Sequence, residues 1–284
     1  MNKIKLPQIG FIGAGKVGCT LGRYFNNCGF PIYGYYSKTK TSAEEGAELT
    51  HSRACTLAEI VAGSDLLFVT VPDTLLEHVW SLVRGLALSG KEICHCSGLY
   101  SSQIFEGIRE TGALGYSLHP FCAVNDRQTF WQQMADVYFT WEGPKLGIFF
   151  EMLLKGIGNP VEEIAPEHKP LYHAAAVFYS NLTIGLAQSA ANIFRSCGLS
   201  SEFTEQAWRS IFLGNAKNMV NKGLTAALTG PIERGDAATV AKHLDKLSEP
   251  EREIYRLLSL AVLETAKQKH PDRDYHIIKE VLEL

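Results

Sequence analysis

A glycine-rich turn near the amino end constrains this chain more than any other feature. An apolar run leads into Gly13, Gly15 and Gly18, which fit the spacing G-x-G-x-x-G, and a helix-like stretch follows. The first glycine allows a tight turn, the second lets the backbone approach a diphosphate, and the third lets helix and strand pack closely. Because the amino end of a helix attracts anions, we predict that this turn binds a dinucleotide. The alternative is a glycine-rich turn that binds no ligand. The expected contacts come from six consecutive residues: Gly13, Ala14, Gly15, Lys16, Val17 and Gly18.

Strand-like and helix-like segments alternate through the first half of the chain. The strand-like runs are residues 5–12, 31–36, 65–71, 92–96, 115–118 and 137–141, and the helix-like segments are 16–28, 43–48, 56–62 and 75–86. Such alternation is typical of parallel β-α-β units with right-handed crossovers. It predicts an α/β fold, a doubly wound parallel sheet of the Rossmann type whose ligand lies beyond the carboxyl ends of the strands.

The second half of the sequence is almost entirely helix-like. A long apolar run, residues 173–197, closes at Gly198, and further helical segments follow at 201–222, 237–247 and 250–269. A helix that is apolar around most of its circumference is buried on most sides. We therefore predict an all-α carboxyl-terminal domain and a domain boundary near residue 160. Residues 160–164 are predicted to add one edge strand. The domains are then 1–160, which binds the dinucleotide, and 161–284, which is helical.

Composition excludes several classes of protein. The 284 residues include 27 basic and 30 acidic side chains, and neither side of residue 160 is basic, which argues against nucleic acid or an anionic membrane as partner. No apolar stretch of about 20 residues is present, as a membrane span requires, and the amino end lacks a signal-peptide pattern. Seven cysteines, mostly in apolar segments, suit free thiols, so we expect a cytoplasmic protein.

The end of the second strand indicates which nicotinamide cofactor binds. Proteins of this fold that bind NAD place an acidic residue there, which bonds the ribose hydroxyls. This chain instead has hydroxyl and cationic side chains, at Ser37, Lys38, Thr39 and Lys40. Lysine attracts a 2′-phosphate that an aspartate would repel, so NADP is preferred over NAD. The alternative is an ordinary polar turn.

Two later strand ends are placed beside the cofactor by topology rather than by side-chain chemistry. Val71 and Pro72 end the strand at 65–71, and Ser97 ends the strand at 92–96. Both ends belong at the carboxyl edge of a parallel sheet, near the ribose and nicotinamide. For Pro72 the alternative is a plain strand stop.

Two histidines lie in or at the end of predicted strands. His119 precedes Pro120, which ends a strand, so His119 is expected to line the site. His95 lies between Cys94 and Cys96, but adjacent residues do not converge on one ion and the spacing is not that of a zinc site, so no metal is expected. A buried histidine satisfied by the backbone is the alternative for His95.

Residues 167–181 hold the main cluster of candidate catalytic groups. In a helix, Lys169 and His173 lie one turn apart on one face, a face that continues to Ser180. Pro170 is tolerated only in the first turn, so Lys169 lies at the helix start, which could bring Lys169, His173 and Asn181 into one cleft. Such groups suit hydride transfer at a carbonyl or imine, where one group gives a proton and another holds a carboxylate. The alternative is a capped helix with polar surface residues.

A loop between predicted helices supplies the remaining candidates. Residues 228–236 read LTGPIERGD, in which Gly-Pro and Gly-Asp mark tight turns. Thr229 and Arg234 are candidate substrate ligands, since a guanidinium suits a carboxylate. The alternative is an interhelical loop with an Arg234–Asp236 pair.

Taken together, these motifs resemble a family of NADP oxidoreductases whose Rossmann-like domain is followed by an all-helical domain of unknown function. The likeness covers nearly the whole chain and rests on the glycine turn, Val71-Pro72-Asp73, His95-Cys96-Ser97-Gly98, Ser117-Leu118-His119-Pro120, Tyr172-His173-Ala174-Ala175, Ser180-Asn181, Leu228-Thr229-Gly230-Pro231 and Arg234-Gly235-Asp236. More distantly the chain is similar to pyrroline-5-carboxylate reductases, ketopantoate reductases and β-hydroxyacid dehydrogenases. The last group has a helix lysine followed one turn later by asparagine, where this chain has Lys169 and His173. The resemblance implies NADP as cofactor and a homodimer formed through the helical domain.

The sequence thus predicts an NADP-dependent oxidoreductase that moves hydride between NADP(H) and a small carbonyl or imine substrate bearing a carboxylate. Lys169 and His173 are the candidates for handling the proton, and His119 and Asn181 for orienting the substrate. Ser180, Thr229 and Arg234 are the candidate substrate ligands, Arg234 for the carboxylate. The alternative is a regulatory protein that binds NADP(H) without catalysis.

Overall fold

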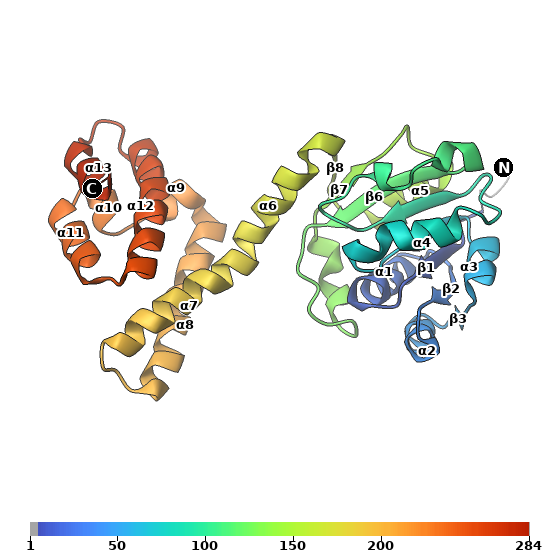
Figure 1. The fold of residues 1–284 in the computed structure, drawn as a ribbon, viewed down its shortest axis with the longest axis horizontal. Coiled ribbons are helices and arrows are strands. Elements are labelled where there is room, and N and C mark those ends of the chain that lie inside the picture. The colour runs from blue at the N-terminus through green and yellow to red at the C-terminus, as the bar shows by residue number, and fades with distance from the viewer. Residues whose placement is uncertain (1–4, 284) are drawn as a thin grey trace. The chain divides into compact units, whose positions relative to one another are not determined.

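The computed structural model describes residues 5–283 and divides into two compact units. These are Met1–Ser180 and Asn181–Leu284 (Figure 1). This division lies about 20 residues after the boundary near residue 160 that the sequence suggested. The last strand of the sheet (Val161–Glu163) and the helix after it (Lys169–Tyr179) still belong to the first unit. The units are described separately below.

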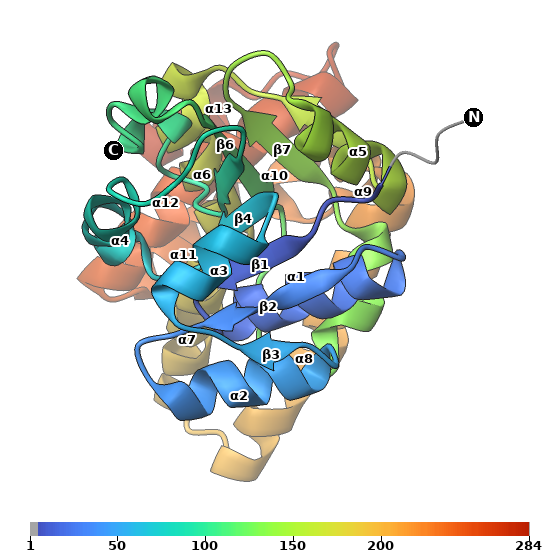
Figure 2. The ribbon, with the colours of Figure 1, turned by 90° about the vertical axis from the view of Figure 1, so that its right-hand side faces the viewer.

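One eight-stranded sheet forms the centre of the first unit, as predicted for a Rossmann-type fold (Figure 2). The strand order is β3-β2-β1-β4-β5-β6-β7-β8, which contains the doubly wound order 3-2-1-4-5-6. All neighbours are parallel except β6 and β7. The strands are β1 (Ile9–Ile12), β2 (Ile32–Tyr36), β3 (Arg53–Ala54), β4 (Leu66–Val69), β5 (Glu92–His95), β6 (Leu114–Pro120), β7 (Phe139–Glu142) and β8 (Val161–Glu163).

Helices cover both faces of this sheet because the central strands are apolar on both sides. The first-unit helices are α1 (Lys16–Asn27), α2 (Lys40–Leu49), α3 (Leu57–Gly63), α4 (Leu76–Val83), α5 (Ile148–Ile157) and α6 (Lys169–Tyr179). Residues of β1 alternate between the faces: Phe11 packs with α1 and α5, whereas Ile12 packs with α3 and α4. Two separate cores result, as expected for strands that are buried on both faces.

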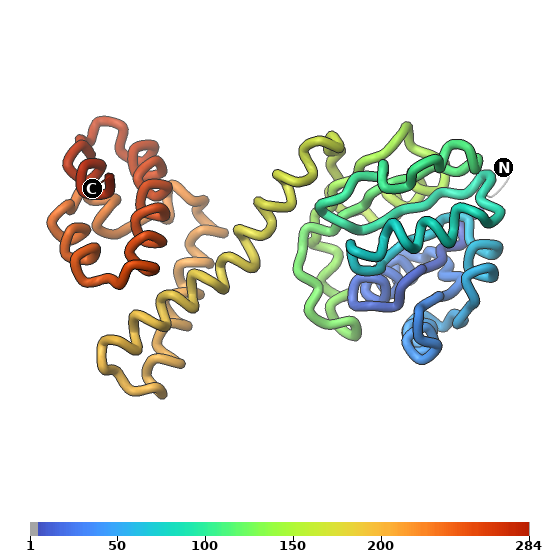
Figure 3. The backbone as a smooth tube through the Cα atoms, viewed as in Figure 1, coloured from blue at the N-terminus to red at the C-terminus, as the bar shows by residue number. Residues whose placement is uncertain are grey.

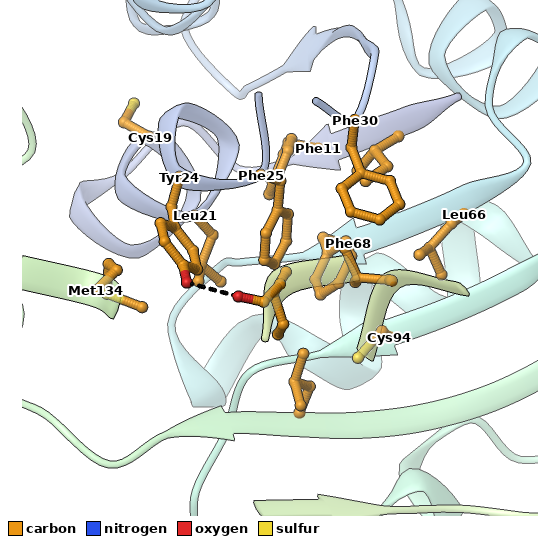
Figure 4. Close-up of a cluster of buried hydrophobic side chains, with 14 of the residues drawn as sticks. Phe11, Cys19, Leu21, Tyr24, Phe25, Phe30, Leu66, Phe68, Cys94 and Met134 are labelled. Atoms are coloured by element: carbon orange, nitrogen blue, oxygen red, sulfur yellow. Dashed lines mark hydrogen bonds between the residues drawn. The ribbon is translucent and has the colours of Figure 1, made fainter. Parts of the chain in front are cut away.

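Aromatic side chains fill the core beneath α1 (Figure 4). The Phe11 ring stacks on Phe68 at 5.5 Å and on Tyr35 at 5.1 Å between centroids. Tyr24 of α1 donates its hydroxyl to the Ile157 carbonyl at the end of α5, at 3.1 Å. These contacts fix α1, and with it the glycine turn that precedes α1.

A buried carboxylate anchors α5 to the sheet. Glu92, 3% exposed, accepts from the backbone N–H groups of Phe149 (3.0 Å) and Phe150 (2.7 Å) in the first turn of α5. A carboxylate at this place satisfies free helix amides and interacts well with the helix dipole. The antiparallel β7 and the edge strand β8 extend the sheet on this side.

The second unit is helical, as predicted. Its helices are α7 (Asn181–Ser196), α8 (Ser201–Lys222), α9 (Leu224–Ala227), α10 (Pro231–Arg234), α11 (Ala237–Lys246), α12 (Glu249–Lys269) and α13 (His276–Glu283) (Figure 3). Its core lies among α10, α11, α12 and α13, around Val240, Leu263 and Ile278. No helix within residues 5–283 is long and apolar enough to span a bilayer.

The single helix predicted over 173–197 was wrong. The chain leaves helical geometry at Ser180, with φ −115° and ψ −87°, so α6 ends at Tyr179 and α7 begins at Asn181. The apolar composition continues across this point without a glycine or proline, so periodicity gave no sign of the break.

Candidate functional site

The register of the sheet brings four strand ends to one edge. Ile12 is aligned with Tyr36 and Val69, Val69 with His95, and His95 with Ser117. The residues that follow each strand therefore lie along the carboxyl edge, where ligands of this fold bind.

The glycine turn after β1 has the shape that a diphosphate requires. Gly13 has φ +113°, and a Cβ there would lie 2.7 Å from the Thr70 carbonyl oxygen. A Cβ on Gly18 would lie 2.5 Å from the Gly13 carbonyl oxygen. Gly15 differs, because a Cβ there would meet no atom of the structure within 4 Å. Gly13 and Gly18 thus shape the turn, and Gly15 keeps its outer side open.

The amino end of α1 faces this open side with its backbone groups free of side-chain caps. No side chain among the described residues caps Gly15, and the first turn of α1 contains no acidic residue. Ala14 is buried, whereas Lys16 is exposed and Val17 half-buried. Free amides, the helix dipole and a lysine together favour an anion, so the turn fits the predicted dinucleotide.

Thr70, at the end of β4, holds the turn in place. Its hydroxyl donates to the Gly13 carbonyl at 2.8 Å, and its backbone N–H donates to the Ile12 carbonyl at 2.8 Å. Thr70 therefore bonds to two successive carbonyls at the start of the glycine turn, those of Ile12 and Gly13.

The predicted 2′-phosphate site lies between β2 and α2. Ser37 is half-buried, and Lys38, Thr39 and Lys40 are exposed. Lys40 pairs with Glu44 at 3.5 Å, and the Thr39 hydroxyl donates to Ser42 at 2.7 Å. Lys38 has no ion pair among the described residues. Of the two lysines, it is therefore the one more available to bind a 2′-phosphate.

Ser97 connects the ends of β4 and β5. Its hydroxyl donates to Asp73 at 2.8 Å and accepts from the backbone N–H groups of Leu99 (3.1 Å) and Tyr100 (3.0 Å). Val71 is half-buried and Pro72 exposed beside it. The Ser97 hydroxyl already has three hydrogen-bond partners in the protein. Ser97 therefore affects the predicted cofactor site by holding the backbone after β5 and the side chain of Asp73 in place.

Lys169 is the only residue of α6 that is buried, with 1% of its surface exposed. Its Nζ donates to the Ser97 carbonyl at 3.0 Å and to the Ser117 hydroxyl at 2.7 Å. Burial lowers the pKa of Lys169, and the negative charges of Glu142 and Asp73 oppose this shift. The amine thus lies at the carboxyl edge of β5 and β6, bonded to neutral groups.

His119 and Tyr172 form a pair beside this lysine. His119 Nδ1 lies 2.8 Å from the Tyr172 hydroxyl. Burial lowers the pKa of His119 to about 3, and the positive charge of Lys169 adds to the effect. His119 is therefore neutral at pH 7. Burial raises the pKa of Tyr172, so its hydroxyl keeps its proton.

His173 is half-buried and lies against the same group of side chains. Its ring centroid is 6.4 Å from that of His119. A Cβ on Gly98 would lie 2.8 Å from both His119 Nε2 and His173 Cδ2. The absence of a side chain at Gly98 lets the two histidines approach the end of β5. The structure thus brings Lys169, His119 and His173 together, and their catalytic roles stay predictions.

His95 lies inside the protein rather than at the surface of the candidate site. It is fully buried, its Nδ1 accepts from the Ser97 N–H at 3.2 Å, and burial lowers its pKa to about 4. The strand histidine is buried, as in the alternative from the sequence, but the backbone satisfies only one ring nitrogen, because Nε2 has no hydrogen-bond partner within residues 5–283. No cluster of three or more potential metal ligands occurs within residues 5–283.

The remaining predicted residues lie at the end of α6 or in the second unit. The Ser180 hydroxyl donates to the Ala176 carbonyl at 2.8 Å, a bond back to its own helix. Asn181 begins α7, and Thr229 and Arg234 are exposed in the second unit. Asp236 caps α11 by accepting from the Thr239 N–H at 3.0 Å, so it is not simply a partner of Arg234. The substrate roles of these residues stay predictions.

Sequence reasoning missed two members of the cluster, Ser117 and Tyr172. Ser117 lies two residues before His119, on the same face of β6, and Tyr172 lies three residues after Lys169 on α6. Both were part of the motifs that carried the family resemblance. Their contacts depend on the alignment of β6 with β5 and with α6, which no local pattern reveals.

Solved structures share this fold across nearly the whole chain. Protein TM1727 from Thermotoga maritima is 25% identical with a TM-score of 0.71, covering 92% of this chain and 99% of its own. An imine reductase from Myxococcus stipitatus in complex with NADP+ is 20% identical (TM-score 0.61, 97% and 100% covered). Plasmodium falciparum pyrroline carboxylate reductase with NADP bound is 15% identical (TM-score 0.59, 97% and 100% covered). No match was found among curated proteins.

Two family models match successive parts of the sequence. Residues 2–120 match the Rossmann-like domain, and residues 137–262 match the Domain of unknown function (DUF2520). The matches agree with the resemblance noted from the motifs. The chain therefore combines a region that matches the Rossmann-like domain with a following region that matches DUF2520.

Proposed function

We propose that this protein is an NADP-dependent oxidoreductase that transfers hydride between NADP(H) and a small carbonyl or imine substrate bearing a carboxylate. The observation that carries the proposal is the buried Lys169 amine, which lies on the same sheet edge as an open glycine turn. A nucleotide-binding fold alone would not require a buried lysine and two histidines there.

The cofactor choice rests on three observations. The turn leaves room for a diphosphate at Gly15, Lys38 offers a cation that forms no ion pair within residues 5–283 near the expected 2′-phosphate, and NADP is bound by two solved structures of the same fold. When bound, NADPH would supply the hydride. Gly13 to Gly18 would hold its diphosphate, and Ser37 to Lys40 its 2′-phosphate.

Lys169 suits the role of proton donor better than His119 does. His119, with a pKa of about 3, is neutral at pH 7 and has no extra proton to release. The Tyr172 hydroxyl can donate to His119 Nδ1, which leaves His119 Nε2–H as a donor that orients a substrate oxygen or nitrogen. We assign Lys169 to proton transfer, with His173 as the second candidate.

Asn181, Ser180, Thr229 and Arg234 complete the proposal as residues that orient the substrate or hold its carboxylate, together with assembly as a homodimer through the helical unit. All seven cysteines are free, which favours a reducing, cytoplasmic compartment.

A cofactor titration followed by a substrate panel tests the proposal. NADPH and NADH binding would be compared first, and we expect tighter binding of NADPH. Keto acids and imino acids would then be assayed by the nicotinamide absorbance. Tighter NADH binding would overturn the cofactor choice, and NADPH binding without turnover on any panel member would favour the non-catalytic regulator.

A further inference from the structure

The amine of Lys169 is held by two neutral oxygens. Its Nζ lies 3.0 Å from the Ser97 carbonyl oxygen and 2.7 Å from Ser117 Oγ. Ser117 is fully buried in β6, and its own hydroxyl donates to the same Ser97 carbonyl at 3.3 Å. The three groups form a closed triangle of hydrogen bonds between β5, β6 and α6.

The direction of each bond follows from the donor inventory. A carbonyl oxygen only accepts hydrogen bonds. The Ser117 hydroxyl donates its hydrogen to the Ser97 carbonyl, so its oxygen accepts from Lys169. An ammonium has three N–H donors and a neutral amine has two plus a lone pair. In either state two positions on Nζ are occupied, and one remains.

We infer that Ser117 is a positioning residue, whose hydroxyl, together with the Ser97 carbonyl, occupies two directions of Lys169 Nζ and leaves the third for exchange of a proton with substrate. This inference rests on the proposed role of Lys169. The Ser117 hydroxyl bonds to the Ser97 carbonyl and to Lys169 Nζ, and we assign it an action through the lysine.

The charged groups described around Lys169 do not contact its amine, so the loss of one neutral acceptor such as Ser117 should alter the stability of the ammonium. Glu142 on β7 accepts from the Ser102 N–H and hydroxyl, and Asp73 accepts from Ser97, so neither carboxylate forms an ion pair with Lys169 among the described residues. On the other elements packed nearby, Cys94, Cys96, His95 and His119 are neutral at pH 7 because burial opposes their charged forms. His173 and Tyr172 are the other titratable groups of the cluster on α6, and Tyr172 is neutral at pH 7 because burial raises its pKa. The ammonium is thus stabilised by its two hydrogen bonds to neutral oxygens and by the negative charges of Glu142 and Asp73, which do not contact it.

The test measures the titration of Lys169 directly. The full-length protein, labelled with ¹³C at lysine Cε, would be titrated by NMR, and the Lys169 resonance assigned as the one absent from Lys169→Arg. Ser117→Ala removes an acceptor that stabilises the ammonium more than the amine. We expect the pKa of Lys169 to fall by about one pH unit, a tenfold change in the ratio of amine to ammonium.

Ser64→Ala is the matched control. Ser64 is also a buried serine, 1% exposed, whose hydroxyl donates to a backbone carbonyl, Ile60 at 2.7 Å, but it precedes β4 at the opposite end of the strand. It should leave the titration of Lys169 unchanged. Ser117→Cys, similar in volume but a weaker acceptor, should give a smaller fall than Ser117→Ala, and it carries the test if the alanine variant does not fold.

The outcomes separate this inference from the proposed function. A Lys169 pKa that stays the same in both Ser117 variants, or that falls as far in Ser64→Ala, overturns the inference whatever the activity. In an active enzyme, Ser117→Ala should also move the alkaline limb of the kcat profile to lower pH by the same amount. An inactive protein whose Lys169 titration nevertheless responds to Ser117 refutes the proposed catalysis and retains the positioning role.

Discussion

The side chains of Lys169 and His173 can be tested singly. Replacing Lys169 with Ala removes the proposed proton donor, and we expect kcat to fall by about 10²–10⁴-fold. His173→Ala should lower kcat to a smaller extent if His173 only assists. NADPH affinity, measured by fluorescence titration, should change little in both variants.

Lys155→Ala is the control for the loss of a lysine. Lys155 is 74% exposed in its side chain and pairs with Glu151 on α5. Its replacement should leave kcat unchanged. Normal turnover in Lys169→Ala would remove Lys169 from the proposed mechanism.

The buried histidines make folding stability depend on pH. The pKa of His119 falls from 6.5 to about 3 and that of His95 from 6.5 to about 4. Between these values and 6.5 the unfolded chain binds more protons than the folded one, so the free energy of unfolding decreases as the pH falls through this window. We expect a loss of roughly 3 kcal/mol per histidine between pH 7 and pH 4.

Urea unfolding at several pH values measures this dependence. His119→Gln should make the decrease shallower, whereas His78→Gln, at an exposed histidine on α4, should leave it as in the wild type. Equal slopes in the wild type and His119→Gln would contradict the depressed pKa of His119.

Among the elements, the glycine turn offers a matched pair of variants. Gly18→Ala places a methyl group against the Gly13 carbonyl and Thr70, so we expect a loss of about 1–3 kcal/mol in stability. Gly15→Ala meets open space and should fold with an unchanged melting temperature. The same methyl group would intrude on the diphosphate, so NADPH affinity should fall at least about tenfold. Unaltered NADPH binding by Gly15→Ala would place the diphosphate elsewhere.

Elements that depend on local chemistry could be predicted from the sequence. The turn at Gly13 follows from its spacing, and α6 begins at Lys169 because Pro170 is acceptable only in a first turn. His119 could be placed because Pro120 ends its strand. These features need only a few neighbouring residues.

Elements and contacts that depend on distant parts of the chain could not be predicted. The bond from Lys169 to Ser117 joins residues 52 positions apart, and the bond from Lys169 to Ser97 joins residues 72 apart. The break at Ser180 gave no signal because the apolar pattern on both sides fits one helix. The sequence thus pointed to Lys169 as a candidate but not to the groups that hold its amine.

At the scale of the whole molecule, the second unit carries large apolar side chains that its own core does not cover. Ile211 is 73% and Val220 85% exposed on α8, and Ile184 is 70% exposed on α7. An apolar hollow lies between these two helices, lined by Ile184, Trp208 and Ile211 among others. Exposed apolar patches of this kind mark protein interfaces, and the homodimer through this unit stays a prediction.

Sedimentation or light scattering of the wild type and two charge variants tests this assembly. We expect a dimer for the wild type and a monomer for Ile211→Glu, because an unpaired carboxylate in an apolar interface is costly. Tyr138→Glu is the control, since Tyr138 is 64% exposed but belongs to the first unit, and it should remain dimeric. A dimer that survives Ile211→Glu would exclude this face of α8 from the interface. A monomeric wild type would refute the homodimer.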